Sequence, residues 1–266
     1  DSIDWGFLDE GMTCWSHNYF GECYHLSWEY FQYYRYLDNV RTFFMENGID
    51  TAINQSNYDM PELVTYIEYV KTPLVLEKLR VEIGHEKFIE GLSLFLKQNY
   101  FRVGTLAGLQ AALEVVCGRS LDWFFLPWFE NPRLPDYSFT GVVYDREEGT
   151  LLVTIEDENE VYNTYSYSQK VPIRVLDSTH EILNDKAVWI NGTTALTLEV
   201  TREPDEVILL YDDYILVELP AQDIHSLSTR NIQIAGEFPL IVGLEVIAVI
   251  ATITIVVAWY IRRRES

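Results

Sequence analysis

The sequence predicts an α+β protein with a helical part, a β-sandwich and one C-terminal transmembrane helix. Three observations predict this order. Apolar residues recur at intervals of three and four as far as Pro132, which is typical of amphipathic helices. From Ser138 they alternate with polar residues, as in half-buried strands. Residues 238–261 are almost entirely apolar, as in a helix that crosses a bilayer.

These patterns divide the chain into five segments. With 266 residues, 48% of them hydrophobic, the chain is long enough to bury a core in one large or two ordinary domains. We expect a helical region over 1–133, a β-sandwich over 134–220, a juxtamembrane stalk over 221–237, a transmembrane helix over 238–261 and a cytoplasmic tail over 262–266.

Helix ends in the first segment are marked by residues with special backbone roles. Gly84 separates two amphipathic runs, and Thr105 is a suitable N-cap for a helix over Leu106–Val116. Gly118 is placed to end that helix, and Pro132 closes the helical region. Short connections between consecutive helices predict a compact bundle.

Short alternating runs after Ser138 predict about seven strands, the size of a small β-sandwich. Glu148-Gly149 and Asn191-Gly192 supply turn signals between them. The clearest runs are Val171–Val175, Ala187–Ile190, Leu196–Val200 and Val207–Leu210.

The apolar run 238–261 contains one charged residue, Glu245. As a helix it would be roughly 36 Å long, enough to cross a bilayer core of about 30 Å. Trp259 and Tyr260 suit the membrane interface, and the arginines at 262–264 predict a cytoplasmic tail, with the residues before 238 outside the cell. Glu245 either stays protonated, reaches the outer interface or meets a partner helix.

Charge and cysteine content restrict the function classes. Forty-one acidic and nineteen basic residues give a net charge of −22, which repels nucleic acid and excludes it as a partner. The three cysteines are too few for a disulfide framework and lack zinc-ribbon spacing. Cys14 and Cys23 are near enough in sequence to pair, and the alternative is that they are small buried residues. Two glycosylation triplets begin at Asn54 and Asn191 and fit an external location.

The run Trp5-Gly6-Phe7-Leu8-Asp9-Glu10-Gly11 resembles the W-L-N/D-E-G motif of the M1 family of zinc aminopeptidases. The resemblance implies that Glu10 is the third zinc ligand. A catalytic zinc site suits a carboxylate on a rigid element, with one coordination position left to water. Gly11 would let another helix or the substrate approach closely. Without the family resemblance, an Asp-Glu pair is more typical of a solvated helix face.

A second motif, Tyr69-Val70-Lys71-Thr72-Pro73-Leu74-Val75-Leu76, resembles the family's Y-x-K-G-x-x-V-L segment. The resemblance implies that the Tyr69 hydroxyl donates a hydrogen bond to the developing oxyanion, which suits a phenol that is neutral near pH 7. Thr72-Pro73 stands where the family usually has Gly-Ala. The resemblance covers roughly residues 3–220. It implies the helical half of a thermolysin-like zinc peptidase domain, followed by an immunoglobulin-like β-sandwich.

The two histidine ligands of that family belong to an H-E-x-x-H turn, which this chain lacks. His85-Glu86 is followed by isoleucine at the fifth place, and His180-Glu181 also has no second histidine there. The resemblance therefore implies that an upstream catalytic segment supplies both histidines and the glutamate base. We expect the chain alone to be inactive.

The sequence thus predicts the C-terminal part of a cell-surface zinc aminopeptidase that removes N-terminal residues from peptides. Its cofactor would be one Zn²⁺ shared with upstream ligands. Its partners would be the peptide substrate, the upstream segment and the membrane, and homo-oligomer formation is left open. The alternatives are a non-catalytic M1-like surface scaffold or binding protein and an unrelated helical receptor ectodomain.

Overall fold

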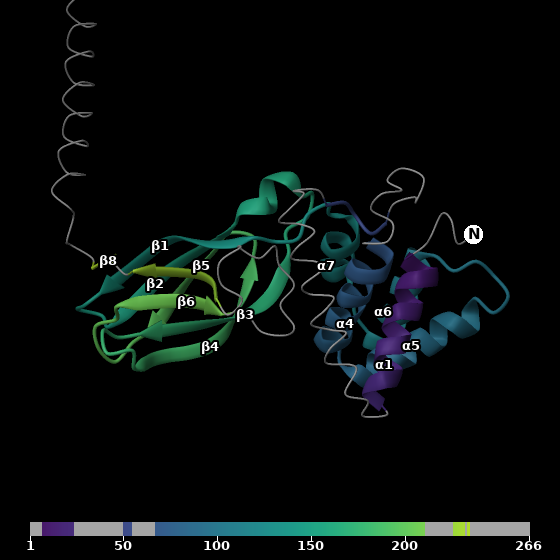
Figure 1. Ribbon diagram of the computed structural model, residues 1–266, viewed down its shortest axis with the longest axis horizontal. Coiled ribbons are helices and arrows are strands. Elements are labelled where there is room, and N and C mark those ends of the chain that lie inside the picture. The colour runs from purple at the N-terminus through teal and green to yellow at the C-terminus, as the bar shows by residue number, and fades with distance from the viewer. Residues whose placement is uncertain (1–6, 24–49, 55–66, 211–225, 232, 235–266) are drawn as a thin grey trace, which may run out of the picture.

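The computed structural model describes residues 7–23, 50–54, 67–210, 226–231 and 233–234, which form a helical part and a β part (Figure 1). The helical part contains the N-terminal elements, and the β part follows it along the chain. This arrangement confirms the mixed helix-and-sheet class that the sequence predicts. Part of the predicted helical run, residues 55–66, lies outside the described residues.

In the helical part, two short π-helices lead directly into two longer α-helices. The π-helix η1 (Phe7–Gly11) runs into α1 (Met12–Cys23), and η2 (Ile67–Lys71) runs into α4 (Thr72–Ile83). The remaining helices are α5 (His85–Gln98), α6 (Leu106–Cys117), α7 (Asp122–Phe125) and the π-helix η3 (Leu126–Glu130).

The predicted helix boundaries are confirmed at three residues. Gly84 has a φ of 90° between α4 and α5. Thr105 caps α6 because its Oγ1 accepts a hydrogen bond from the Gly108 backbone N–H at 3.0 Å. Gly118 ends α6 in the left-handed conformation, with a φ of 68°.

A single apolar core joins these helices. Helices α5 and α6 pack closely because Gly91 presents no side chain, and a Cβ there would lie 2.4 Å from Leu113 Cδ2. The fully buried members of this core include Val75, Leu79, Phe88, Leu109, Leu113, Phe124, Trp128 and Phe129.

The β part consists of two four-stranded sheets. One has the order β5-β2-β1-β8 and the other β4-β3-β6-β7. All pairings are antiparallel except the parallel contact of β1 with β8. The strands are β1 (Tyr137–Asp145), β2 (Thr150–Asp157), β3 (Ser168–Leu176), β4 (Ile182–Asn191), β5 (Thr194–Glu199), β6 (Glu206–Leu210), β7 (Ser226–Asn231) and β8 (Gln233–Ile234).

The two sheets share a core built from alternating residues of each strand. Val153 and Leu198 enter it from one sheet, and Ile173 and Leu209 enter it from the other. The described residues thus form a two-sheet β-sandwich, and its immunoglobulin-like character stays a prediction. Strands β7 and β8 fall within 221–237, where the sequence predicts a stalk; in the structure they extend the two sheets.

The junction between the two parts is tightly hydrogen-bonded. Tyr167, just before β3, is fully buried in the helical core and lies edge-on to Trp128 at 4.6 Å between ring centroids. Its hydroxyl donates to the Arg133 carbonyl at 2.8 Å. The Asn131 side chain donates to the Tyr165 carbonyl and accepts from two backbone N–H groups of the same segment. The β part is therefore held directly against the helical core.

The membrane prediction concerns residues outside the described ranges. The predicted span 238–261, with Glu245, and the tail 262–266 lie there. Among the helices that the structure describes, none is both long enough and apolar enough to cross a membrane.

Candidate active site

The π-helices η1 and η2 hold Glu10 and Tyr69 and lie against each other. Their contact depends on Gly11, because a Cβ there would lie 2.3 Å from Thr72 Cγ2 and 2.8 Å from Thr72 Cβ. The Thr72 hydroxyl is turned to the backbone and donates to the Ile67 carbonyl at 2.7 Å. Gly11 thus permits the close helix approach that the sequence predicts. Short π-helical turns inside longer helices are frequent at functional sites.

The structure brings Glu10 and Tyr69 together. The Tyr69 phenol lies close enough to Glu10 for the carboxylate to influence its pKa, although 59 positions separate the two residues in the sequence. Burial raises the pKa of the Tyr69 phenol to about 12, and the nearby Glu10 carboxylate adds to the shift. The hydroxyl is therefore protonated at neutral pH and can act as a hydrogen-bond donor.

Cys14 is a neighbour of this pair that the sequence argument did not select. It lies one helical turn after Glu10, and it is close enough to Tyr69 to contribute to the raised pKa of the phenol. The spacing i, i+4 to Glu10 is the signal that could have identified it, because such residues share a helix face. Cys14 is partly buried, Cys23 is exposed, and no disulfide forms within the described residues.

Lys71 anchors η2 from inside the protein. Its fully buried ammonium is 3.0 Å from Asp50 Oδ2 and donates to the Thr51 carbonyl at 2.8 Å. A longer contact of 3.5 Å reaches the Pro132 carbonyl. Burial lowers the pKa of Lys71, and the Asp50 carboxylate opposes this shift. Lys71 therefore ties the Tyr69 turn to two distant chain segments.

Glu10 is the single metal-ligand candidate that the motifs place in this region. No group of three His, Cys, Asp or Glu side chains is arranged to hold a metal ion in the part of the chain that the structure describes. His85 lies elsewhere, where its ring contacts Tyr19 and Arg80 at 3.3 Å each. His180 occupies a turn in the β part with a φ of 61°. Neither histidine supplements Glu10.

Comparison with known proteins finds a family model that matches part of this chain. Residues 4–128 match the model of the peptidase family M1 domain, a range that contains Glu10 and Tyr69.

Two individual proteins can be named as similar. The alanine/arginine aminopeptidase of Saccharomyces cerevisiae is 22% identical over 221 residues, which are 72% of this chain and 25% of the yeast protein. The crystal structure of Legionella pneumophila aminopeptidase A in complex with aspartic acid matches 76% of this chain with a TM-score of 0.54 and 22% identity. That likeness concerns the fold. The chain spans about a quarter of the yeast relative and 22% of the Legionella chain.

Proposed function

We propose that this chain is the C-terminal part of a cell-surface zinc aminopeptidase that hydrolyses N-terminal residues from peptides. The observation that carries the proposal is the proximity of Tyr69 to Glu10 where η1 packs against η2. Two separate motifs select these residues, and the fold places them in contact. In an unrelated helical protein, contact between these two residues would be a coincidence.

Glu10 could supply one of the protein ligands that a zinc ion needs. The carboxylate is only partly buried, its helix turn is packed against η2, and its partner is a neutral phenol. Oxygen from a carboxylate is a suitable zinc ligand, but a catalytic site needs three protein ligands. We propose that an upstream segment of the same protein supplies two histidines and a glutamate base. When bound, the zinc would polarise the peptide carbonyl and activate a water. Without that segment, this chain would be inactive.

Glu10 and Tyr69 would then have separate roles in the site. Glu10 would hold the metal from one side. The Tyr69 O–H would donate a hydrogen bond to the carbonyl oxygen of the scissile peptide as negative charge develops there. Rotation about the phenol C–O bond is enough to turn the proton from the Glu10 carboxylate towards that oxygen. Lys71 and Gly11 would fix the distance between the two helix turns.

We also propose the location that the sequence predicts. The apolar run 238–261 and the arginines at 262–264 would anchor the protein, with the helical and β parts outside the cell. Protease treatment of intact cells should then digest epitopes in residues 67–210 while the tail 262–266 is protected. Protection of both regions would contradict this orientation.

The metal assignment is tested with Glu10→Gln in the complete protein, including its upstream segment. The amide is nearly isosteric with the carboxylate but carries no charge, so zinc content measured by elemental analysis should fall and peptidase activity with it. Asp9→Asn is the matched control, because Asp9 is the exposed neighbour in the same turn. It should keep full zinc content. Unchanged zinc in Glu10→Gln would contradict the ligand assignment, and a zinc-free wild-type protein would favour the M1-like scaffold.

A further inference from the structure

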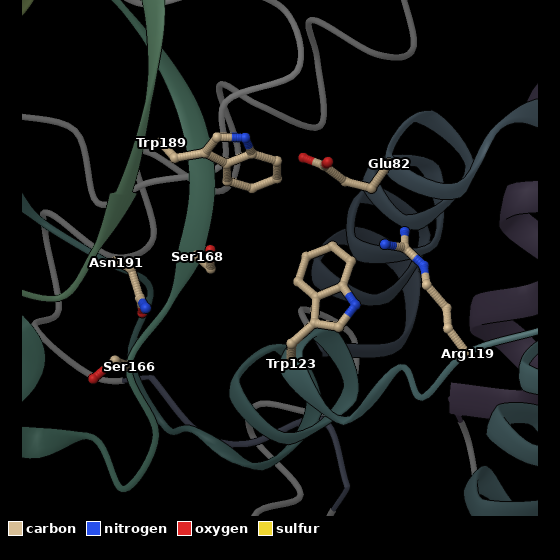
Figure 2. Close-up of a pocket in the computed structure, with 7 residues that line it drawn as sticks. All are labelled: Glu82, Arg119, Trp123, Ser166, Ser168, Trp189 and Asn191. Carbon is tan, nitrogen blue, oxygen red and sulfur yellow. The ribbon is translucent and has the colours of Figure 1, made fainter. Parts of the chain in front are cut away.

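A cleft lies where the helical and β parts meet. Its volume is about 410 Å³, and it is partly open to solvent. Figure 2 shows side chains of the two parts on opposite sides: Ser166, Ser168, Trp189 and Asn191 from the β part, and Glu82, Arg119 and Trp123 from the helical part. The cleft is separate from Glu10 and Tyr69, neither of which lines it.

Trp189 and Asn191 belong to the same face of β4. They are two residues apart in the strand, so their side chains leave the sheet on one side, and both line the cleft. Trp189 is 47% exposed, a large solvent-facing area for an indole. Its ring is perpendicular to that of Trp123, with 6.3 Å between ring centroids. Lys170 Nζ lies over one face of the ring, 5.6 Å from its centroid, which leaves the other face of Trp189 for a ligand near the exposed Asn191.

Asn191 also begins a tight turn that presents its side chain. Asn191-Gly192-Thr193 is an N-x-Thr triplet at the connection of β4 with β5. Gly192 adopts a φ of 55°, which favours glycine. The Asn191 backbone N–H donates to Thr194 Oγ1 at 2.9 Å, so the turn is held through the backbone.

The other triplet, which begins at Asn54, offers a contrast. Asn54 Nδ2, the atom to which a sugar is attached, donates to Glu130 Oε1 at 2.7 Å. The Asn54 backbone N–H donates to the Phe129 carbonyl at 2.9 Å. Modification of Asn54 would place a sugar on a partly buried nitrogen that already contacts Glu130 next to the helical core. The structure therefore distinguishes two sites that the sequence pattern treats as equal.

We propose that Asn191 is N-glycosylated and that its first sugar occupies the cleft, with one face packed on Trp189. In this modification Asn191 Nδ2 attacks the anomeric carbon of a sugar carried on a lipid phosphate. The new C–N bond forms as the C–O bond to phosphate breaks, the lipid phosphate leaves with the electron pair, and the amide gives one proton to a base of the transferase.

Physical complementarity favours this occupant. The C–H face of a pyranose ring is apolar and carries slight positive charge, which suits the negative face of an indole. The sugar hydroxyls need donors and acceptors, and Ser168, Glu82 and Arg119 provide them in the same cleft. A sugar at this place would contact both parts of the molecule and stabilise their junction. The proposal rests on the external location proposed above but not on the peptidase chemistry.

Glycopeptide mass spectrometry of the protein from its native membrane tests the modification. Trypsin releases the two triplets separately, in the peptide Ala187–Arg202 and in the peptide spanning 42–71. Sugar should be found on Ala187–Arg202 only. Asn191→Gln and Thr193→Ala should abolish it, while Thr193→Ser should retain it. A bare Asn191 in protein shown to be external, or sugar on Asn54, would overturn the proposal.

The packing on Trp189 is tested by removing the glycan. Deglycosylation should lower the folding equilibrium constant of the wild-type protein roughly threefold to tenfold, the range expected for one aromatic contact. In the Trp189→Ala variant, deglycosylation should change the folding equilibrium constant little. Equal losses in both proteins would overturn the cleft assignment.

Peptidase assays on the same samples distinguish the two proposals. An active enzyme with bare Asn191 contradicts only the glycan proposal, and a glycosylated protein without zinc contradicts only the peptidase proposal.

Discussion

The helical part and the β part use their buried charges differently. In the helical part, the buried Lys71 joins η2 to residues 50–51 and 132, three segments that are distant in the sequence. In the β part, the buried Asp177 accepts hydrogen bonds from backbone N–H groups two and four residues later. The first charge is fully buried and holds three segments in place. The second closes a turn and also pairs at 2.8 Å with Arg202, which is half exposed. A fully buried charge with long-range partners therefore supports the turn that holds Tyr69.

The two parts also differ in the regularity of their backbone. Regular strands with alternating burial make up the β part, whereas Glu10 and Tyr69 both lie in π-helical turns. We expect these irregular turns to depend on contacts with residues outside them. Gly11, Thr72 and Lys71 support the turns through a close contact and buried hydrogen bonds. The comparison predicts that substitutions at these supports affect the whole helical part, while similar changes in the β part have small effects.

The largest loss of stability is expected for Lys71→Met. The substitution leaves the Asp50 carboxylate buried without its ammonium partner, which costs about 3–5 kcal/mol. Urea unfolding followed by tryptophan fluorescence measures the loss. Adding Asp50→Leu should recover most of it, because both buried charges are then absent. Lack of recovery would show that the hydrogen bond to the Thr51 carbonyl, rather than the ion pair, carries the stability.

The matched change in the β part is Arg174→Met. Arg174 pairs with Asp185 across β3 and β4, and both side chains are more than a third exposed. Surface pairs of this kind contribute about 0–1 kcal/mol because water and salt screen them. A loss as large as that of Lys71→Met would remove the difference between the two parts.

Tyr69→Phe should have the largest effect on catalysis without unfolding the protein. It removes the proposed oxyanion donor and keeps the ring, so kcat should fall about 10²- to 10³-fold in the complete enzyme. Zinc content should stay unchanged, which separates this variant from Glu10→Gln. Tyr100→Phe is the control, because Tyr100 is 73% exposed in a loop between α5 and α6. Equal activity of both variants would contradict the role of Tyr69.

The sequence could predict the fold class because each part has its own periodicity. Gly84, Thr105 and Gly118 act locally, so their positions alone indicated where helices begin and end. The Glu10–Tyr69 contact was accessible through two motifs. Asp50 and Cys14 were not, because their roles depend on tertiary contacts with Lys71 and Tyr69. Strands β7 and β8 were missed for a related reason: their polar sequence shows no alternation, and pairing with β6 and β1 defines them.

Gly11→Ala tests whether the close contact of η1 with η2 serves the site. The added methyl would meet Thr72, and relief of that clash should cost about 1–3 kcal/mol. Activity per folded molecule should also fall, because the two turns must separate. Gly91→Ala is the control: its methyl would meet Leu113 in α6, so it should lower stability by a similar amount and leave the activity of the folded enzyme unchanged. Equal activity in both would argue against a specific role for Gly11.

A further expected effect concerns alkaline pH and two buried tyrosines, Tyr137 in the β core and Tyr167 at the junction of the two parts. Burial raises the pKa of Tyr137 and of Tyr167 well above the ordinary value for a phenol. As pH rises above about 10, these phenols lose protons in the unfolded state while the folded state keeps them. The unfolded state then binds fewer protons, so the free energy of unfolding decreases by about 1.4 kcal/mol per pH unit for each phenol. Their stabilising contribution is complete below pH 10 and is lost as pH approaches the raised folded-state pKa.

Urea unfolding from pH 8 to 11 measures this effect. The free energy of unfolding should decline less steeply with pH for Tyr137→Phe than for the wild-type protein. Parallel curves of unfolding free energy against pH would show that the Tyr137 phenol ionises equally in the folded and unfolded states. Water would then reach this part of the β core.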